Sequence, residues 1–289
     1  MFRCFLRPLF AALVLMLSAT AHASDAPRIA TVDWTLTETL LALGVTPVGV
    51  AETDGYRRWV EAPALPPEVI DIGLRSQPNR ELLAGLDLDF ILISPLYGAL
   101  EPVVSQIGPV ESMTMYGPGG DLWQRMQDIT LRLGRRVGRG TQARTLLAGL
   151  DHRLDKLHNA FDRTQQRPLL VVQLIDDRHV RVYGDNSLFD MVLQRLGIAN
   201  AWPGQTNHWG FANVGVEALA TVNDAQLVVV EPVPQGAAEA LADSPVWRRL
   251  PAVQAHGVLT LPAVWSFGGP SSAARFADLL ANALLEEDL

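Results

Sequence analysis

The fold of this chain is decided by residues 141–167, TQARTLLAGLDHRLDKLHNAFDRTQQR. Apolar side chains recur in this stretch at spacings of four and three, with charged residues between them: Leu146, Leu150, Leu154, Leu157 and Phe161. That spacing predicts a single helix with a narrow apolar stripe, about 35 to 40 Å long at 1.5 Å per residue. Pro168 follows and cannot continue a helix, so the helix is expected to end before it.

Short apolar runs alternate with helical stretches on both sides of this helix. Before it, the pattern predicts strands near residues 28–33, 48–50, 69–72 and 90–93 and helices near 36–43 and 80–86. After it, the pattern predicts strands near residues 169–175, 227–230 and 258–261 and a helix over 271–285. Strands interleaved with helices are typical of βαβ units, so the fold class is α/β with mostly parallel sheets.

The order of these elements favours two Rossmann-like lobes joined by one long helix. The N-terminal lobe is expected over residues 24–140, the linking helix over 141–167 and the C-terminal lobe over 168–289. Each flank holds enough alternating elements for a sheet of its own, although a single large domain with one long helix is the alternative. Two such lobes would face each other across a cleft lined by loops that follow the strands.

Composition excludes several classes of protein. The 289 residues carry 23 Lys and Arg against 31 Asp and Glu, for a net charge of −8, and 48% are hydrophobic. Nucleic-acid binding needs Lys and Arg arrayed against phosphates, which a net-negative chain does not favour. A half-apolar chain of this length buries a large core, so it is folded rather than disordered.

Residues 1–23 are typical of a secretory signal peptide. Arg3 and Arg7 form a short basic region, an apolar stretch over residues 9–17 is too short to span a bilayer, and Ala21-His22-Ala23 is a small-x-small cleavage site. A signal anchor is the alternative. The one cysteine, Cys4, lies inside this leader, so the mature protein is expected to carry neither a disulfide nor a lipid anchor. Loss of the two leader arginines would lower the net charge from −8 to −10, and a periplasmic location fits best.

Catalytic and metal-binding motifs are missing from the sequence. It contains no Gly-x-Ser-x-Gly elbow, Walker loop, Gly-x-Gly-x-x-Gly fingerprint or His-Glu-x-x-His helix. The five histidines beyond the leader are scattered: His152, His158, His179, His208 and His256. Carboxylates do not cluster as a hard metal requires. We therefore expect no enzyme activity and no intrinsic cofactor, and any metal bound would arrive already chelated.

Aromatic residues in loops rich in Gly and Pro indicate a small-molecule site. They are Trp59, Tyr97, Trp202, Trp209 and Trp265. Any one of these could be a packing residue, but five at strand-to-helix junctions in both lobes would form a pocket with apolar walls. Arg75 follows a predicted strand end and would project into the same cleft. Its planar guanidinium suits a ligand with several oxygen acceptors, whereas a surface salt bridge is the alternative.

Several separated motifs resemble the FhuD-like family of periplasmic ferric hydroxamate-binding proteins, which serve siderophore ABC importers. The stretches that carry the resemblance are LGVTPVGVA (43–51), VIDIGLRSQPN (69–79), GDNSLF (184–189), NAWPGQTNHWG (200–210) and PAVW (262–265). The resemblance runs through essentially the whole mature sequence. It implies a protein of two lobes on a single long helix. Because the link is one helix rather than flexible strands, we expect only a small closure on binding.

The resemblance also implies a set of ligand-binding residues. Arg75 and Tyr97 would hydrogen-bond the hydroxamate oxygens around an iron that the siderophore already coordinates fully. Trp209 and Trp265, with Trp59 and Trp202 as further candidates, would pack on the siderophore's hydrocarbon, and Asn207 would make a polar contact. The chain departs from the pattern of the family at His208, where an aromatic residue is expected, and at Ser266-Phe267, where an aromatic pair is expected. One wall of the pocket is therefore altered, and the preferred siderophore stays open.

The expected partners are a ferric hydroxamate siderophore and an inner-membrane ABC permease. In related importers an acidic residue on each lobe meets arginines of the permease, and Glu101 and Glu217 hold those positions here. Favourable charges at helix starts are the alternative explanation for both glutamates. We expect a monomer. Alternative ligands for the same fold are ferric citrate, a catecholate, haem or cobalamin, and a periplasmic siderophore hydrolase is the alternative of another class.

Overall fold

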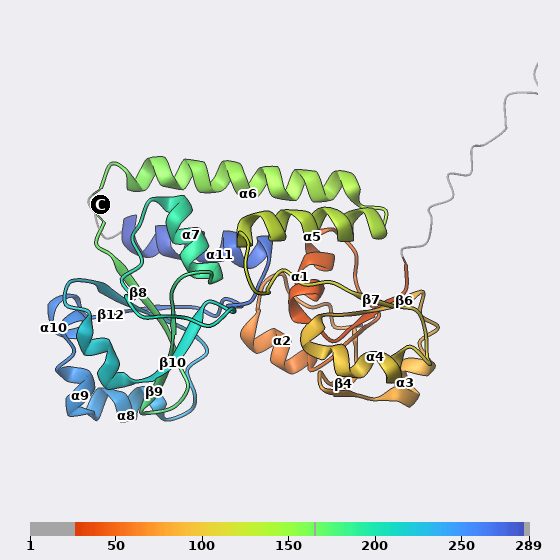
Figure 1. Cartoon of the computed structure of the whole chain (residues 1–289), viewed down its shortest axis with the longest axis horizontal. Helices are drawn as coiled ribbons and strands as arrows, with labels where there is room; N and C mark the ends of the chain where they lie inside the picture. Colours follow the sequence, from red (N-terminus) through yellow and green to blue (C-terminus); the bar gives the residue numbers. More distant parts are fainter. Residues whose placement is uncertain (1–26, 165, 286–289) are drawn as a thin grey trace, which may run out of the picture.

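The computed structural model describes residues 27–164 and 166–285, which form two α/β lobes side by side beneath one long helix (Figure 1). Each lobe contains a five-stranded sheet of its own. The fold predicted from the sequence is thereby confirmed. The predicted leader, residues 1–23 with Cys4, lies outside the described residues.

The N-terminal lobe is built on a wholly parallel sheet of strand order β3-β2-β1-β6-β7. Its strands are β1 (Ile29–Thr31), β2 (Gly49–Val50), β3 (Ile70–Asp71), β6 (Phe90–Ile93) and β7 (Val110–Ser112), with a small hairpin of β4 (Gly73–Leu74) and β5 (Gln77–Pro78). Its helices are α1 (Trp34–Ala42), α2 (Thr53–Trp59), α3 (Arg80–Ala84), η1 (Pro95–Leu100), α4 (Glu101–Val104) and α5 (Leu122–Arg136).

The C-terminal lobe carries a mixed sheet of strand order β10-β9-β8-β11-β12. Its strands are β8 (Leu169–Leu174), β9 (His179–Tyr183), β10 (Phe211–Gly215), β11 (Gln226–Val230) and β12 (Val258–Leu261). Its helices are α7 (Leu188–Leu196), η2 (Val216–Thr221), α8 (Ala237–Asp243), α9 (Pro245–Arg248), α10 (Pro251–His256) and α11 (Pro270–Leu285). Strands β8, β11 and β12 are parallel, whereas β9 runs antiparallel to both of its neighbours.

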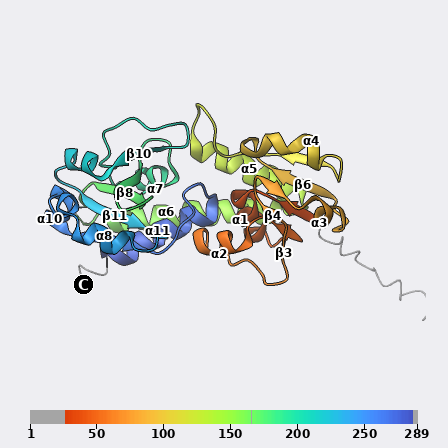
Figure 2. The ribbon, with the colours of Figure 1, turned by 90° about the horizontal axis from the view of Figure 1, so that it is seen from below.

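The linking helix α6 runs from Gly140 to Phe161, along the top of both lobes (Figure 1). It is about 33 Å long at 1.5 Å per residue, and it ends six residues before the end of the predicted range 141–167. The Thr164 hydroxyl donates to the carbonyl of Phe161 and satisfies one terminal acceptor there. The buried stripe contains Leu150, Leu154 and Phe161 and packs against α7 and α11, while α5 lies alongside the other half of the helix. Seen from below, the two lobes lie end to end under α6 (Figure 2).

Helix α1 of the N-terminal lobe is joined to the C-terminal lobe by a buried carboxylate. Glu38 is fully buried, and its side chain accepts hydrogen bonds from the Gly269 backbone N–H and from the Ser272 hydroxyl, the latter at 2.5 Å. Both donors lie at the start of α11, where a helix has unpaired N–H groups and a partial positive charge. Burial raises the pKa of Glu38 to about 7, although these hydrogen bonds oppose the shift. The carboxylate thus links the two lobes across the base of the cleft.

We predict that Glu38 makes the stability of the protein depend on pH. Because its pKa is raised from 4.5 to about 7 in the folded protein, its contribution to the free energy of unfolding is fully present below pH 4.5 and falls as the pH rises to about 7. Glu38→Gln, which keeps a donor and an acceptor, should remove this dependence. The wild type should lose on the order of 3 kcal/mol relative to the variant between pH 4.5 and 7.5, as measured by urea unfolding. Parallel stability curves for the two proteins would contradict the prediction.

Candidate ligand-binding site

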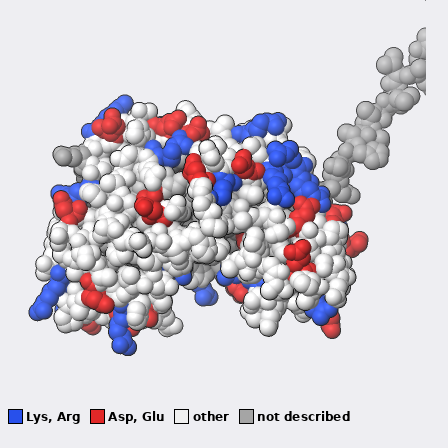
Figure 3. Space-filling view, in the orientation of Figure 1, with Lys and Arg blue, Asp and Glu red and all other residues white. Residues whose placement is uncertain are grey.

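A cavity of about 630 Å³ opens between the two lobes. The space-filling view shows the molecule notched between the lobes on the side away from α6 (Figure 3). The lining residues of the N-terminal lobe are Asp33, Trp34, Thr35, Leu36, Glu52, Gly55, Arg58, Trp59, Arg75, Ser94, Leu96, Tyr97, Met113, Thr114, Met115 and Tyr116. The C-terminal lobe contributes Arg181, Trp209, Phe211, Trp265 and Phe267. The volume suits a small organic ligand.

The lining residues of the N-terminal lobe are positioned by the carboxyl ends of its parallel strands. The chain enters the cavity wall directly after β1, β2, β6 and β7, as the lining residues Asp33, Glu52, Ser94 and Met113 show. Asp33 also caps α1, since its carboxylate accepts from the N–H groups of Thr35 at 2.9 Å and Leu36 at 3.1 Å. The loops that follow the strands therefore form the cleft, as the sequence predicted.

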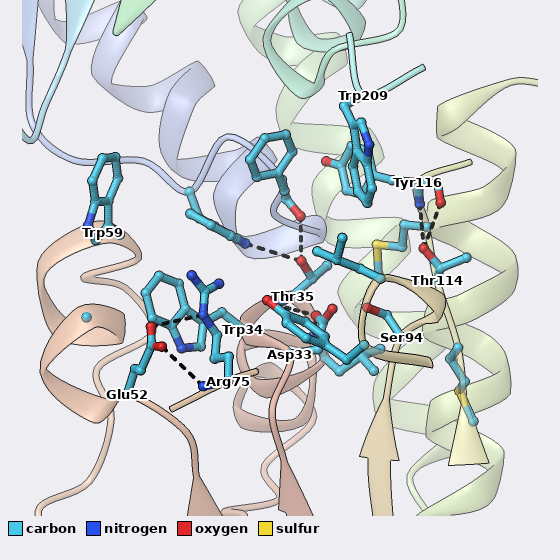
Figure 4. A pocket seen from close by; sticks show the side chains of 18 of the residues that line it. Asp33, Trp34, Thr35, Glu52, Trp59, Arg75, Ser94, Thr114, Tyr116 and Trp209 are labelled. Carbon is cyan, nitrogen blue, oxygen red and sulfur yellow. Dashed lines mark hydrogen bonds and ion pairs between the residues drawn. The ribbon is translucent and has the colours of Figure 1, made fainter. Parts of the chain in front are cut away.

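Arg75 is held upright in the cavity by an acid and an aromatic ring (Figure 4). Glu52 accepts from its backbone N–H and from its Nε, each at 3.1 Å. Its guanidinium carbon lies 3.7 Å from the ring centre of Trp34, the geometry of a cation–π contact. The described residues offer no hydrogen bond to its two terminal nitrogens. The salt bridge that was the alternative explanation thus exists, and it orients the fork while leaving two NH₂ groups for a ligand.

Tyr97 lies near Arg75 on the same side of the cavity. It belongs to η1, directly after β6, and is half-buried. Burial raises the pKa of the Tyr97 hydroxyl, and the positive charge of Arg75 partly opposes that shift. The group therefore stays protonated at neutral pH and can donate a hydrogen bond to an oxygen.

An aromatic wall closes the opposite side of the cavity. The ring of Trp209 stacks on Tyr116 with centroids 5.9 Å apart and meets Phe267 edge-on at 5.6 Å. Trp265 meets Phe267 at 5.2 Å and Trp34 at 5.1 Å. Figure 4 shows Trp59 and Trp209 on opposite sides of the site. Such rings provide apolar surface for a ligand at little conformational cost.

The chain contains no separate place for a metal ion within the described residues. No group of three or more His, Cys, Asp and Glu side chains there could hold one. The charged groups that line the cavity are Asp33, Glu52, Arg58, Arg75 and Arg181, which favours a ligand with oxygen acceptors over a bare cation. None of the described helices is both long and apolar enough to cross a bilayer.

The model of one protein family matches residues 29–264, and that family is described as periplasmic binding protein. The chain belongs to the periplasmic binding protein family. It is 37% identical to the iron(3+)-hydroxamate-binding protein FhuD of Escherichia coli, over 92% of this chain and 90% of that protein. It is 28% identical to the achromobactin-binding periplasmic protein of Dickeya dadantii, over 84% of this chain and 81% of that protein. The resemblance read from the sequence motifs is confirmed.

A solved structure agrees with this membership. The crystal structure of siderophore-binding protein FhuD from Vibrio cholerae, with Fe³⁺-Desferal bound, matches with a TM-score of 0.85 at 27% identity. The match covers 90% of this chain and 98% of that one. This periplasmic binding protein therefore shares the two-lobed arrangement of a protein solved with a ferric hydroxamate chelate.

The structure brings most of the predicted site residues together. Arg75, Tyr97, Trp59, Trp209 and Trp265 all line the cavity. Trp202 and Asn207 do not. The ring of Trp202 packs over Gly184 and Gly204 against the apolar cluster of the C-terminal lobe that contains Val180 and Val182.

Asn207 braces the loop that carries Trp209. Its side-chain oxygen accepts from the Trp209 N–H at 2.9 Å and from the Phe211 N–H at 3.4 Å. His208 is exposed and lies against Trp209 at 5.1 Å without lining the cavity. The pattern of aromatic loop residues thus identified the cavity wall, but it did not separate residues that line the cavity from those that shape the loop.

Sequence reasoning missed Arg181 and Ser94. Arg181 lies in β9, a strand that the sequence pattern did not predict, and Ser94 has a buried hydroxyl without a partner among the described residues. Alternation in HVRVY (179–183) is the signal that could have placed Arg181 on one face of a strand, because Val180 and Val182 are buried on the other.

We predict that Gly210 is required to hold the Trp209 loop. Its φ is +80°, and a Cβ there would lie 2.2 Å from the Ser187 backbone nitrogen. Gly236 has a similar φ of +76° but nothing within 4 Å, so it provides a matched control. Gly236→Ala should cost about 1 to 2 kcal/mol for the left-handed backbone alone, whereas Gly210→Ala should cost at least about 3 kcal/mol because of the clash. Equal losses in urea unfolding would show that the loop can move aside.

Proposed function

We propose that this periplasmic binding protein captures ferric hydroxamate siderophores and delivers them to an inner-membrane ABC permease for iron uptake. The observation that carries the proposal is a pair of donors that the N-terminal lobe contributes to the cavity lining. The terminal nitrogens of Arg75 and the hydroxyl of Tyr97 make no hydrogen bond to a described residue, and they lie in a cavity with aromatic walls. Such a site suits a chelate whose oxygens point one way and whose hydrocarbon points the other.

The chemistry of the ligand matches these two sides. A hexadentate hydroxamate satisfies the coordination of the ferric ion, so the protein supplies no metal ligand. The hydroxamate oxygens share the ligand's negative charge and accept charge-assisted bonds from Arg75, each contributing about 1.5 to 3 kcal/mol. Trp209, Trp265 and Trp59 cover the hydrocarbon arms. Because the donors address the iron–hydroxamate group, different siderophore backbones should bind.

The relatives support this assignment. The E. coli protein at 37% identity is named for iron(3+)-hydroxamate binding, and the V. cholerae structure was solved with Fe³⁺-Desferal. These relatives are binding proteins rather than enzymes, which argues against a siderophore hydrolase. Incubation of the protein with a ferric hydroxamate followed by chromatography would detect a hydrolysis product if one formed.

Export by a cleavable signal peptide, without lipid attachment, is part of the same proposal. The basic, apolar and small-residue segments of residues 1–23 support it, and mass spectrometry of the exported protein would identify its first residue. We also propose a monomer with a small closure. Three side chains of the N-terminal lobe, Thr35, Glu38 and Tyr116, hydrogen-bond the segment of residues 267–272 below the cavity, which limits how far the lobes can rotate.

The first test is a titration of intrinsic tryptophan fluorescence with ferrichrome. We expect saturable quenching, because Trp59, Trp209 and Trp265 line the cavity. Arg75→Ala should weaken binding about tenfold to a hundredfold, and Tyr97→Phe should weaken it by about tenfold at most. Arg80→Ala is the matched control, since Arg80 is exposed and outside the cavity.

Quenching that does not saturate would refute the hydroxamate assignment and return the search to ferric citrate, catecholates, haem and cobalamin. An equal loss of affinity in Arg75→Ala and Arg80→Ala would refute the assigned site.

We also propose that Glu101 and Glu217 dock on the permease. Glu101 begins α4 on one lobe and Glu217 lies in η2 on the other, and both are exposed. Charged residues at the edge of a protein–protein interface mainly change the rate constant of association. Glu101→Lys and Glu217→Lys should leave ferrichrome binding in solution within about twofold of wild type, while cellular uptake of radioactive ferrichrome falls at least about tenfold. Glu239→Lys, an exposed change on α8, is the control, and unchanged uptake in both docking variants would contradict the proposal.

A further inference from the structure

Arg181 is the one arginine that the C-terminal lobe contributes to the described lining of the cavity, where Arg58 and Arg75 come from the N-terminal lobe. It lies in the middle of β9, and its neighbours Val180 and Val182 are buried on the far face of the sheet. The face of β9 that carries Arg181 also carries Tyr183, which packs with Phe189 and Phe211 in the aromatic core behind the cavity. The strand thus directs this side chain toward the cleft.

The Arg181 guanidinium rests on the aromatic wall. Its central carbon lies 4.3 Å from the ring centre of Phe211 and 5.7 Å from that of Phe267. Both rings line the cavity as well. The guanidinium is therefore held by packing, as Arg75 is held on Trp34 in the opposite lobe.

Arg75 and Arg181 differ in how their charge is balanced. Arg75 has Glu52 at 3.1 Å. Arg181 takes part in none of the ion pairs among the described residues. Its Nε–H is cut off from solvent and has no acceptor in the described part of the chain.

The Tyr183 hydroxyl is a polar neighbour of Arg181 on the same strand. Burial raises the pKa of Tyr183, whereas the charge of Arg181 and side-chain hydrogen bonding with Ser266 and Arg181 oppose that shift. A tyrosine hydroxyl does not neutralise a guanidinium. The fold therefore leaves a partly buried positive charge facing the ligand, which disfavours the empty site and favours an anion.

We infer that Arg181 is a specificity-determining residue that selects ferric hydroxamate chelates bearing an additional negatively charged group, a carboxylate above all. The inference rests on the proposed function and adds a charge preference to it. Arg75 donates to the hydroxamate oxygens, and its charge is already balanced by Glu52. The positive charge of Arg181 has no such partner, so a neutral chelate leaves it uncompensated. A carboxylate on an arm of the siderophore would meet the guanidinium fork in a charge-assisted pair.

The test uses three ferric chelates that share one trihydroxamate core and differ in the charge of the group at the end of one arm. They are ferrioxamine B with its free ammonium, its N-acetyl derivative, which is neutral, and its N-succinyl derivative, which ends in a carboxylate. Fluorescence titration of the wild type should give the tightest binding for the succinyl chelate and the weakest for the ammonium chelate, with about a tenfold spread. In Arg181→Leu the spread should fall below about twofold while the neutral chelate keeps its affinity within about threefold.

Arg178→Leu is the matched control. Arg178 precedes β9, its side chain is 83% exposed, and it does not line the cavity, yet its loss changes the net charge equally. A similar collapse of the spread in this control would show a long-range field effect and overturn the inference. So would an unchanged spread in Arg181→Leu, or no dependence on arm charge in the wild type.

Two further outcomes separate this inference from the proposed function and from a structural role. If the neutral chelate fails to bind the wild type, the proposed function itself is wrong; if it binds and charge has no effect, only the role of Arg181 is wrong. A structural role would lower the melting temperature of Arg181→Leu without changing the spread. Should that variant fail to fold, Arg181→Gln removes the charge while keeping a polar side chain, and the same reduction of the spread is expected.

Discussion

The buried carboxylate of Glu38 is the contact on which the arrangement of the site depends. It joins α1, the first helix of the N-terminal lobe, to the start of α11, the last helix of the C-terminal lobe. Four residues earlier in α1, Trp34 supports Arg75, and Thr35 donates to the Phe267 carbonyl at 2.5 Å and accepts from Trp265 at 3.2 Å. One helix therefore holds both walls of the cavity. Because these contacts already hold the two lobes together in the absence of ligand, binding orders few further groups and costs little conformational entropy.

Within this arrangement, the site separates recognition of oxygen from recognition of hydrocarbon. Glu52 adopts the left-handed backbone conformation, with φ of 53°, and uses both carboxylate oxygens on Arg75. This strained residue fixes the direction of the guanidinium fork and leaves its outer nitrogens available. The tryptophans and Phe267 need only apolar contact. In the proposed function, iron is recognised indirectly, through oxygens whose charge and geometry the metal sets, so the protein needs no metal ligand of its own.

Features that repeat along the chain were predictable from the sequence, and features that depend on distant contacts were not. The continuous apolar runs at 90–93 and 169–174 and the periodic stripe of α6 were predicted close to their observed places. Helix α5 and the antiparallel strands β9 and β10 were not predicted. The aromatic loop residues identified the cavity, yet Trp202 turned into the lobe because Gly184 and Gly204 leave room for its ring. The roles of Glu38 and Arg181 require both lobes to be in place, which no local pattern reveals.

Residues 266 and 267 show how the cavity wall and the link between the lobes are coupled here. Ser266 is buried. The ring of Phe267 lines the cavity against Trp209 and Trp265, and Arg181 lies near it, while its carbonyl accepts the hydrogen bond from Thr35. The same residue thus forms part of the ligand wall through its side chain and part of the link between lobes through its backbone. Because the backbone carries the link, the side chain at this position can change with the ligand while the link is preserved.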